Sequence, residues 1–204
     1  MEKIQHYIST LQQTMDQLPQ TLIAEVIEIL QRARLQGNQV FILGNGGSAS
    51  TASHFVCDLA KNTRRVDLPH FRVIGLTDNM AIFSAYANDD GYENVFSLQL
   101  ANLIRPDDIV IAISASGNSK NVLNAIEEAQ KHSATTIGFT GFDGGHLGQM
   151  VHINIHVKSN IIEHVEDIHL MLEHMIVKVL KDQGPSVANM TESLANYQMD
   201  VLGD

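Results

Sequence analysis

Residues 39–50 read QVFILGNGGSAS, and this stretch decides the fold. It begins with a continuous apolar run up to Leu43, which is typical of a strand covered on both faces. The glycines that follow favour a tight turn, and residues 49–61 then have the spacing of a helix. We therefore interpret residues 39–61 as a buried strand, a glycine turn and a helix.

The same pattern repeats along the chain. Short apolar runs alternate with stretches of helical spacing, which predicts a parallel sheet with helices on both faces. The expected strands are residues 39–43, 72–76, 109–114, 135–140 and 153–157. The expected helices between and after them are residues 49–61, 79–87, 92–103, 120–131 and 162–181.

Both ends of the chain differ from this central pattern. Apolar residues recur at three- and four-residue spacing before residue 37, which predicts two helices separated by Pro19. Gly184 and Pro185 mark a break near the other end. We expect one structural domain in three parts: residues 1–36 are helices that pack on the domain and in an oligomer, residues 37–183 are its body, and residues 184–204 are a C-terminal extension.

The composition excludes several classes of protein. Of 204 residues, 44% are hydrophobic and 18% are charged, as in a globular domain. The formal charge of −10 and the absence of tryptophan argue against a nucleic-acid binder. The apolar runs are too short to cross a membrane, and the N-terminus lacks the apolar core of a signal peptide. We expect a cytoplasmic protein that binds neither nucleic acid nor a membrane.

Glycine and serine residues follow two of the expected strands, where open α/β sheets bind ligands. Backbone N–H groups, serine hydroxyls and the start of the next helix together suit a phosphate group. The alternative is that the glycines make tight turns and the last serine of each loop caps a helix. The first loop is Gly44-Asn45-Gly46-Gly47-Ser48, and the second is Ser114-Ala115-Ser116-Gly117-Asn118-Ser119.

Histidines and carboxylates recur on two of the expected helices. His54 and Asp58 are four residues apart and share one helix face. Glu166 and His174 are eight residues apart, or about 80° around a helix axis, so both can face one groove. Two imidazoles and two carboxylates suit zinc or another divalent cation. The alternative for His54 and Asp58 is an ion pair on a helix surface.

At these residues the chain resembles the phosphoheptose isomerase branch of the SIS (sugar isomerase) domain family. The resemblance covers residues 35–182 and rests on the segments GNGGSASTASHF, ANDDGYENVFS, ISASGNSKNV, GFTGFDGG and EHVEDIHLMLEH. It implies a flavodoxin-like, five-stranded parallel sheet and a homotetramer with active sites at subunit interfaces. It also implies the interconversion of sedoheptulose 7-phosphate and D-glycero-D-manno-heptose 7-phosphate through an enediol-like intermediate.

The resemblance also implies roles for individual residues. Asp58 and His174 would be the acid–base pair. The metal, expected to be zinc, would be bound by His54, Asp58, Glu166 and His174. The substrate would contact Asn45, Gly46, Gly47, Asn88, Asp89 and Glu166, and its phosphate would be held by Ser114, Ala115, Ser116 and Ser119, with Ser48 as a further candidate.

Two of these residues depart from the family pattern, which usually has glutamate at position 58 and glutamine at position 166. Asp58 therefore has about 1.5 Å less reach than the usual residue. Glu166 adds a second carboxylate, which would bind a cation more tightly and raise its neighbour's pKa without one. One hypothesis is that the two changes compensate, and that Glu166 shares or takes over the role of the base.

A non-catalytic SIS protein is the alternative function: a phosphosugar-binding or DnaA-binding regulator. Such a relative lacks the full set of histidines and carboxylates that this chain keeps, which favours the enzyme. We see no helix-turn-helix segment, so a transcription regulator is disfavoured. Among the remaining candidates, we expect Cys57 to be a small buried residue and His169 to be structural rather than catalytic.

Overall fold

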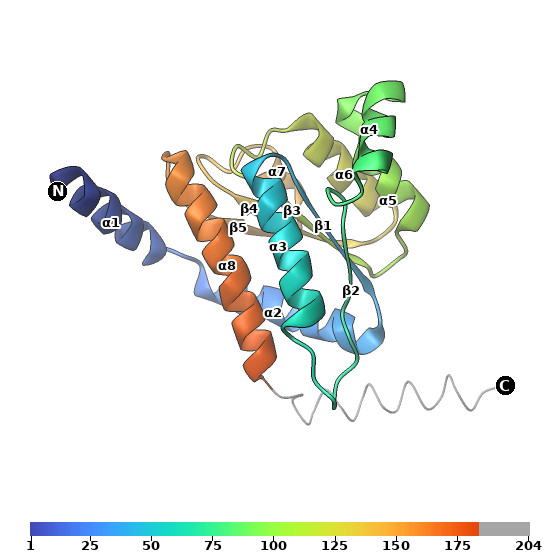
Figure 1. Ribbon diagram of the computed structural model, residues 1–204, viewed down its shortest axis with the longest axis horizontal. Helices are drawn as coiled ribbons and strands as arrows, with labels where there is room; N and C mark the ends of the chain where they lie inside the picture. Colours follow the sequence, from blue (N-terminus) through green and yellow to red (C-terminus); the bar gives the residue numbers. More distant parts are fainter. Residues whose placement is uncertain (184–204) are drawn as a thin grey trace.

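Five strands form one parallel sheet in the computed structural model, which describes residues 1–183 (Figure 1). Their order across the sheet is β2-β1-β3-β4-β5, the order of flavodoxin-like folds. The fold class predicted from the sequence is therefore confirmed. The strands are β1 (Gln39–Gly44), β2 (Arg72–Gly75), β3 (Ile109–Ser114), β4 (Thr135–Thr140) and β5 (Ile153–His156).

The helices alternate with these strands, and α2 begins immediately after Pro19, as the sequence predicts. The N-terminal helices are α1 (Glu2–Met15) and α2 (Gln20–Gln36). The others are α3 (Gly47–Lys61), α4 (Met80–Asp89), the 3-10 turn η1 (Tyr92–Asn94), α5 (Ser97–Leu103), α6 (Lys120–Lys131), α7 (Leu147–Met150) and α8 (Ile162–Asp182). The predicted extension, residues 184–204, lies outside the described residues.

Helices cover both faces of the sheet, and each face has its own apolar core. Val40 and Ile42 of β1 belong to the core under α2, α3 and α8. Phe41 and Leu43, which alternate with them, belong to the core under α5, α6 and α7. Because successive side chains of a strand point to opposite faces, a strand buried on both faces must be apolar at every position. This explains the continuous apolar run in the sequence.

The structure differs from the prediction between residues 92 and 103. A single helix was expected there, but the segment divides into η1 and α5. The division falls at Val95 and Phe96, which are both fully buried. Adjacent residues of one helix point about 100° apart, so the break lets both side chains enter the same core.

Helix α1 extends away from the sheet at the left of Figure 1. Tyr7 of α1 donates a hydrogen bond to Asp167 of α8 at 2.5 Å, and the ring of Tyr7 packs edge-on against His164. Ile4 and Ile8 of α1 remain exposed. Within residues 1–183, none of the helices combines the length and apolar character needed to span a bilayer.

Candidate active site

The first glycine loop joins β1 to α3 and leaves the start of the helix open. Gly46 precedes the helix with φ +55° and ψ −122°, a conformation that favours glycine. No side chain caps this helix. The N–H groups of a first helical turn have no acceptor within the helix, so they are available to an anion.

Gly47, the first residue of α3, lies directly against Glu166 of α8. A β-carbon at position 47 would come within 2.7 Å of Glu166 Oε1 and 2.9 Å of Oε2. A larger residue at position 47 would therefore force the Glu166 carboxylate, the flexible end of its side chain, to move away from the start of α3. Glu166 thus borders the first loop, where an oxygen acceptor can contact a ligand's hydroxyl groups.

The second loop joins β3 to α6 and lies beside the first, because β1 and β3 are paired strands. Ser119 precedes α6 but its side chain makes no capping hydrogen bond. The hydroxyl oxygens of Ser114 and Ser116 accept hydrogen bonds from the N–H groups of Gly117 and Asn118. The loop is thus folded on itself, and the hydroxyl of Ser119 does not cap α6.

A neighbouring loop holds the second loop in place. The N–H of Gly141 donates to the carbonyl of Ala115, and the N–H of Leu147 donates to the carbonyl of Gly117. Asn118 Oδ1 accepts from the N–H of His146. Gly117 has φ +62°, and a β-carbon there would collide with the carbonyl of Gly144. The second loop is therefore rigidly packed before any ligand binds.

Four potential metal ligands converge between α3 and α8, which lie side by side (Figure 1). They are His54 and Asp58 of α3 and Glu173 and His174 of α8, and their ligand atoms all lie within 4.8 Å of one another. The rings of His54 and His174 meet edge to face, with centroids 4.9 Å apart. Asp58 Oδ1 accepts a 2.6 Å hydrogen bond from Asn62, which fixes its carboxylate.

Glu173 is the unusual member of this group, because it is a fully buried carboxyl. Among the described residues, neither of its oxygens has a hydrogen-bond partner. Burial, and secondly the negative charge of Asp58, raise the pKa of Glu173 to about 8. His174 Nε2 lies 3.4 Å from Glu173 Oε2. A buried polar group without a partner calls for a ligand or a proton.

The donor set fits a divalent cation. Two imidazoles and two carboxylates are a common zinc environment, and a cation would satisfy the unpartnered Glu173 oxygens. The side chains of His54 and His174 are 44% and 51% exposed, so the group opens to the surface. The arrangement can therefore exchange protons with a bound molecule.

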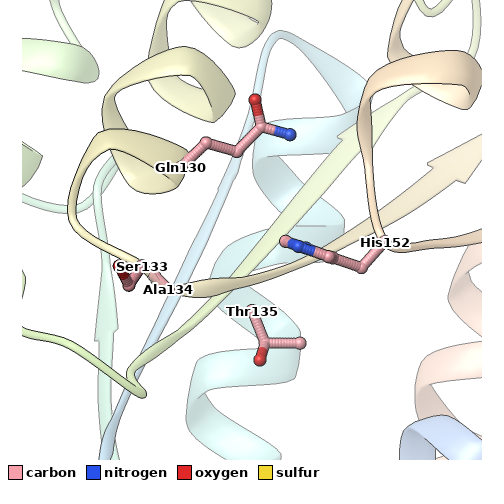
Figure 2. A pocket seen from close by; sticks show the side chains of 5 residues that line it. All are labelled: Gln130, Ser133, Ala134, Thr135 and His152. Atoms are coloured by element: carbon pink, nitrogen blue, oxygen red, sulfur yellow. The ribbon is translucent and has the colours of Figure 1, made fainter.

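A small recess adjoins the first loop. It has a volume of about 110 Å³ and is lined by Gly44, Asn45, Gly46, Ala49, Thr77, Met80, Phe83 and Tyr92. A wider hollow of about 490 Å³ lies at the first residue of β4, whereas the glycine loops follow the last residues of β1 and β3. It is lined by Gln130, Ser133, Ala134, Thr135 and His152 (Figure 2). That hollow contains none of the predicted site residues, so we place the site at the glycine loops.

Comparison with known proteins identifies the family. The SIS-domain model matches residues 5–141. A phosphoheptose isomerase of Geotalea daltonii is 37% identical over 186 residues, which are 89% of this chain and 95% of that protein. The chain belongs to the phosphoheptose isomerase branch of the SIS-domain family.

Other members of this branch agree. A phosphoheptose isomerase of Shewanella sediminis is 38% identical over 174 residues, which are 84% of this chain and 87% of that protein. The solved structure of a phosphoheptose isomerase from Francisella tularensis matches with a TM-score of 0.81 at 31% identity, covering 89% of this chain and 98% of that chain.

The structure brings most of the expected SIS-family site residues into two places. His54, Asp58 and His174 form one group, and Glu173 is their fourth member. Glu166 instead borders the first loop at Gly47. Ser48 is buried in the first turn of α3, and Ser114 is also buried, whereas Ser116 is exposed.

Three expected residues have different surroundings. Asn88 and Asp89 lie exposed in the last turn of α4, where the amide of Asn88 donates to Asp89 Oδ1 at 2.7 Å. Cys57 is exposed, so the expectation that it is buried is wrong. It lies between two helix positions that face the core, Phe55 and Leu59, and points outward itself. His169 is buried and its Nε2 lies 3.3 Å from the carbonyl of Thr140, which suits a structural role.

Sequence reasoning missed Glu173, although a signal for it exists. An apolar stripe at helical spacing runs along α8 and consists of Val165, Ile168, Leu172, Ile176, Val177 and Leu180. Glu173 falls within this stripe, and a charged residue in an apolar stripe is more informative than one on a polar face. That signal was sufficient to make Glu173 a candidate.

Proposed function

We propose that this chain is an aldose–ketose isomerase that interconverts sedoheptulose 7-phosphate and D-glycero-D-manno-heptose 7-phosphate. The observation that carries this proposal is the convergence of His54, Asp58 and His174 on neighbouring helices that also border the first glycine loop. The family membership supports the same reaction class.

The two loops would bind the phosphate end of the substrate. Backbone N–H groups at the starts of α3 and α6, with the hydroxyls of Ser116 and Ser119, would donate hydrogen bonds to it. This kind of site needs no arginine, which agrees with the net charge of −10. We assign the phosphate to the second loop and the adjoining sugar hydroxyls to Asn45 and Glu166.

The size of the site suits a long sugar phosphate. His54 lies seven residues after Gly47, and this corresponds to about 10 Å along α3. An extended seven-carbon chain has six C–C bonds of about 1.5 Å, each of which advances it by a little more than 1 Å, so the chain together with its phosphate group spans a comparable distance. A phosphate at the loops therefore leaves C1 and C2 within reach of His54 and His174.

Asp58 and His174 would transfer the proton. A base removes a proton from C1 of the ketose while an acid gives a proton to the carbonyl oxygen at C2, which yields an enediol. A proton is then delivered to C2 while the hydroxyl on C1 loses its proton, which gives the aldose. His174 is half exposed, so it can contact the substrate, and it lies 3.4 Å from the Glu173 carboxyl. The buried Asp58 is held by Asn62 and completes the acid–base pair. Glu166 remains a third candidate for the base.

We propose that a divalent cation, with zinc as the first choice, assists this reaction. His54, Asp58, His174 and Glu173 would hold it, and Glu166 remains a candidate ligand from the side of the first loop. When bound, the cation supplies Lewis-acid polarisation of the carbonyl and enediol oxygens.

We further propose a cytoplasmic homotetramer with its active sites at subunit interfaces. The exposed His54 and His174 support this arrangement, because a second subunit would cover them. The exposed Ile4 and Ile8 of the projecting α1 also favour burial against another copy of the chain. Asn88 and Asp89 would then belong to the site of the assembled enzyme.

Turnover of sedoheptulose 7-phosphate by the purified chain tests the proposal. We expect His174→Ala and Asp58→Asn to lower kcat at least about 100-fold, as loss of an acid–base group does. Glu166→Gln measures how much Glu166, the third candidate for the base, contributes to turnover. Glu163→Gln, on the exposed side of α8, is the matched control and should retain full activity.

Absence of turnover with a correctly assembled, metal-loaded protein would contradict the proposal and favour a phosphosugar-binding or DnaA-binding regulator. Full activity of both Asp58→Asn and Glu166→Gln would exclude both carboxylates as the base.

A further inference from the structure

We propose that Asn121 is a positioning residue: together with Tyr92, it fixes the side-chain amide of Asn45 and leaves one amide N–H of Asn45 free for the substrate. The inference rests on the proposed function, because it concerns how a sugar phosphate is bound at the first loop. It adds two residues, Asn121 and Tyr92, to the binding machinery.

Asn45 and Asn121 form a reciprocal pair of amide hydrogen bonds. Asn45 Nδ2 donates to Asn121 Oδ1 at 2.9 Å, and Asn121 Nδ2 donates to Asn45 Oδ1 at 2.9 Å. The hydroxyl of Tyr92 also donates to Asn45 Oδ1 at 2.9 Å. Asn121 is only 2% exposed, so its amide is shielded from water. Hydrogen bonds are stronger in such a buried environment than in water.

A backbone group determines which way these amides point. The N–H of Val122 donates both to the carbonyl of Ser119 and to Asn121 Oδ1, each at 3.0 Å. A backbone N–H can only donate, so the atom that it meets must be the oxygen of Asn121. The nitrogen of the Asn121 amide then donates to Asn45, so the acceptor on Asn45 must be Oδ1. The start of α6 thereby sets the orientation of a side chain on the first loop.

The hydrogen-bond count leaves one group of Asn45 unused. Oδ1 has two lone pairs, which accept from Asn121 and Tyr92, and one of the two Nδ2 protons goes to Asn121. The second Nδ2 proton meets no acceptor within residues 1–183. Asn45 lines the recess beside the first loop, so this N–H is available to an oxygen of a ligand bound there.

The pair also connects the two loops. Asn121 is the second residue of α6 and comes two residues after Ser119, so it belongs to the start of the helix that follows the second loop. Asn45 belongs to the first loop. A ligand held at the second loop therefore finds the Asn45 amide already oriented, and no binding energy is used to order it.

Double-variant kinetics test whether Asn121 acts through Asn45. The variants are Asn45→Ala, Asn121→Ala and the combination of both, assayed with sedoheptulose 7-phosphate. We expect each single variant to raise KM roughly 10-fold with little change in kcat, as loss of a uniform binding contact does. The combination should raise KM no further than Asn45→Ala alone, because the positioning residue then has nothing to position.

Inorganic phosphate, used as a competitive inhibitor, separates positioning from a structural role. Its inhibition constant should change less than about 2-fold in Asn121→Ala, since phosphate alone does not need Asn45. Gln130→Ala is the control: Gln130 is on the same helix but donates to the carbonyl of Met150, outside the pair and outside η1. This control should keep the KM of the unaltered chain.

Tyr92→Phe is the second variant, in case Asn121→Ala does not fold. Tyr92 is 52% exposed, and the change removes only its hydroxyl. It should raise KM less than Asn121→Ala, and it should have no effect when combined with Asn45→Ala. Multiplying effects in the combined variants, or a parallel loss of phosphate inhibition, would overturn the inference and leave the proposed function intact. Absence of turnover in both the unaltered chain and Gln130→Ala would instead overturn the proposed function.

Discussion

Replacing Glu173 by glutamine tests the buried carboxyl at the centre of the candidate metal site. In the metal-free chain the pKa of Glu173 rises from its ordinary 4.5 to about 8, chiefly because the side chain is buried. The unfolded chain releases this proton near pH 4.5, whereas the folded chain keeps it until about pH 8. Between these values the unfolded state binds fewer protons, so stability falls as pH rises.

The size of this effect follows from the difference between the two pKa values. It corresponds to a penalty of up to about 5 kcal/mol once the pH is well above 8. Glutamine cannot ionise, so Glu173→Gln removes the pH-dependent part of the penalty. The variant should therefore gain stability relative to the unaltered chain as pH rises from 5 to 9, by a few kcal/mol.

Urea unfolding at several pH values, with a chelator present, measures this difference. Glu163→Gln is the control, because Glu163 is exposed in the first turn of the same helix. Its stability should follow that of the unaltered chain at every pH. If the difference in stability between Glu173→Gln and the unaltered chain stayed the same from pH 5 to pH 9, the assignment of a buried, unpartnered carboxyl would be refuted.

Added zinc should reverse the order of stability. A cation that binds the folded chain stabilises it, and the second carboxylate strengthens that binding. The unaltered chain should therefore show a larger rise in Tm with zinc than Glu173→Gln does. Equal rises would show that Glu173 is not a ligand.

Three further predictions concern stability and the loops. Gly47→Ala should lower kcat/KM at least about 10-fold, because the new β-carbon would displace the Glu166 carboxylate; steady-state kinetics check this, and unchanged kinetics would contradict it. Gly117→Ala should lower the free energy of unfolding by about 2 kcal/mol or more and weaken inhibition by inorganic phosphate. The reason is that φ is +62° at this position and that a β-carbon would meet the carbonyl of Gly144. Equal denaturation midpoints for the variant and the unaltered chain would contradict this. Burial lowers the pKa of His169 to about 4, so the unfolded state binds more protons than the folded state between pH 6.5 and 4, and stability falls as pH drops. This loss amounts to up to about 3 kcal/mol, and His169→Asn should reduce it in urea unfolding at several pH values. An equally steep loss of stability in the variant would oppose the reasoning.

The sheet could be predicted from the sequence because its central strands are buried on both faces. Val40 to Leu43 alternate between two cores, and this requires an uninterrupted apolar run that is visible without a structure. The break before Ser97 was not visible, because it depends on where Val95 and Phe96 find space in the core. That information comes from neighbouring elements and not from local spacing.

The composition of the metal-ligand group shows the same limit. Spacing showed that Glu166 and His174 share a side of α8, but not which part of α3 each one meets. Glu166 contacts Gly47, and His174 contacts His54. Helices α3 and α8 therefore run in the same direction, and these pairs of residues lie at the same height along them. Glu166 is about 12 Å along α8 from His174, and the neighbouring Glu173 takes the place beside Asp58.

The transfer of a proton at the carbon chain is the central claim, and solvent exchange measures it most directly. The purified chain, incubated with sedoheptulose 7-phosphate in deuterium oxide, should introduce deuterium at C1 of the ketose and at C2 of the aldose, as followed by NMR. His174→Ala should introduce almost none. Formation of the aldose with no deuterium at C2, or equal exchange in the His174 variant, would contradict the account.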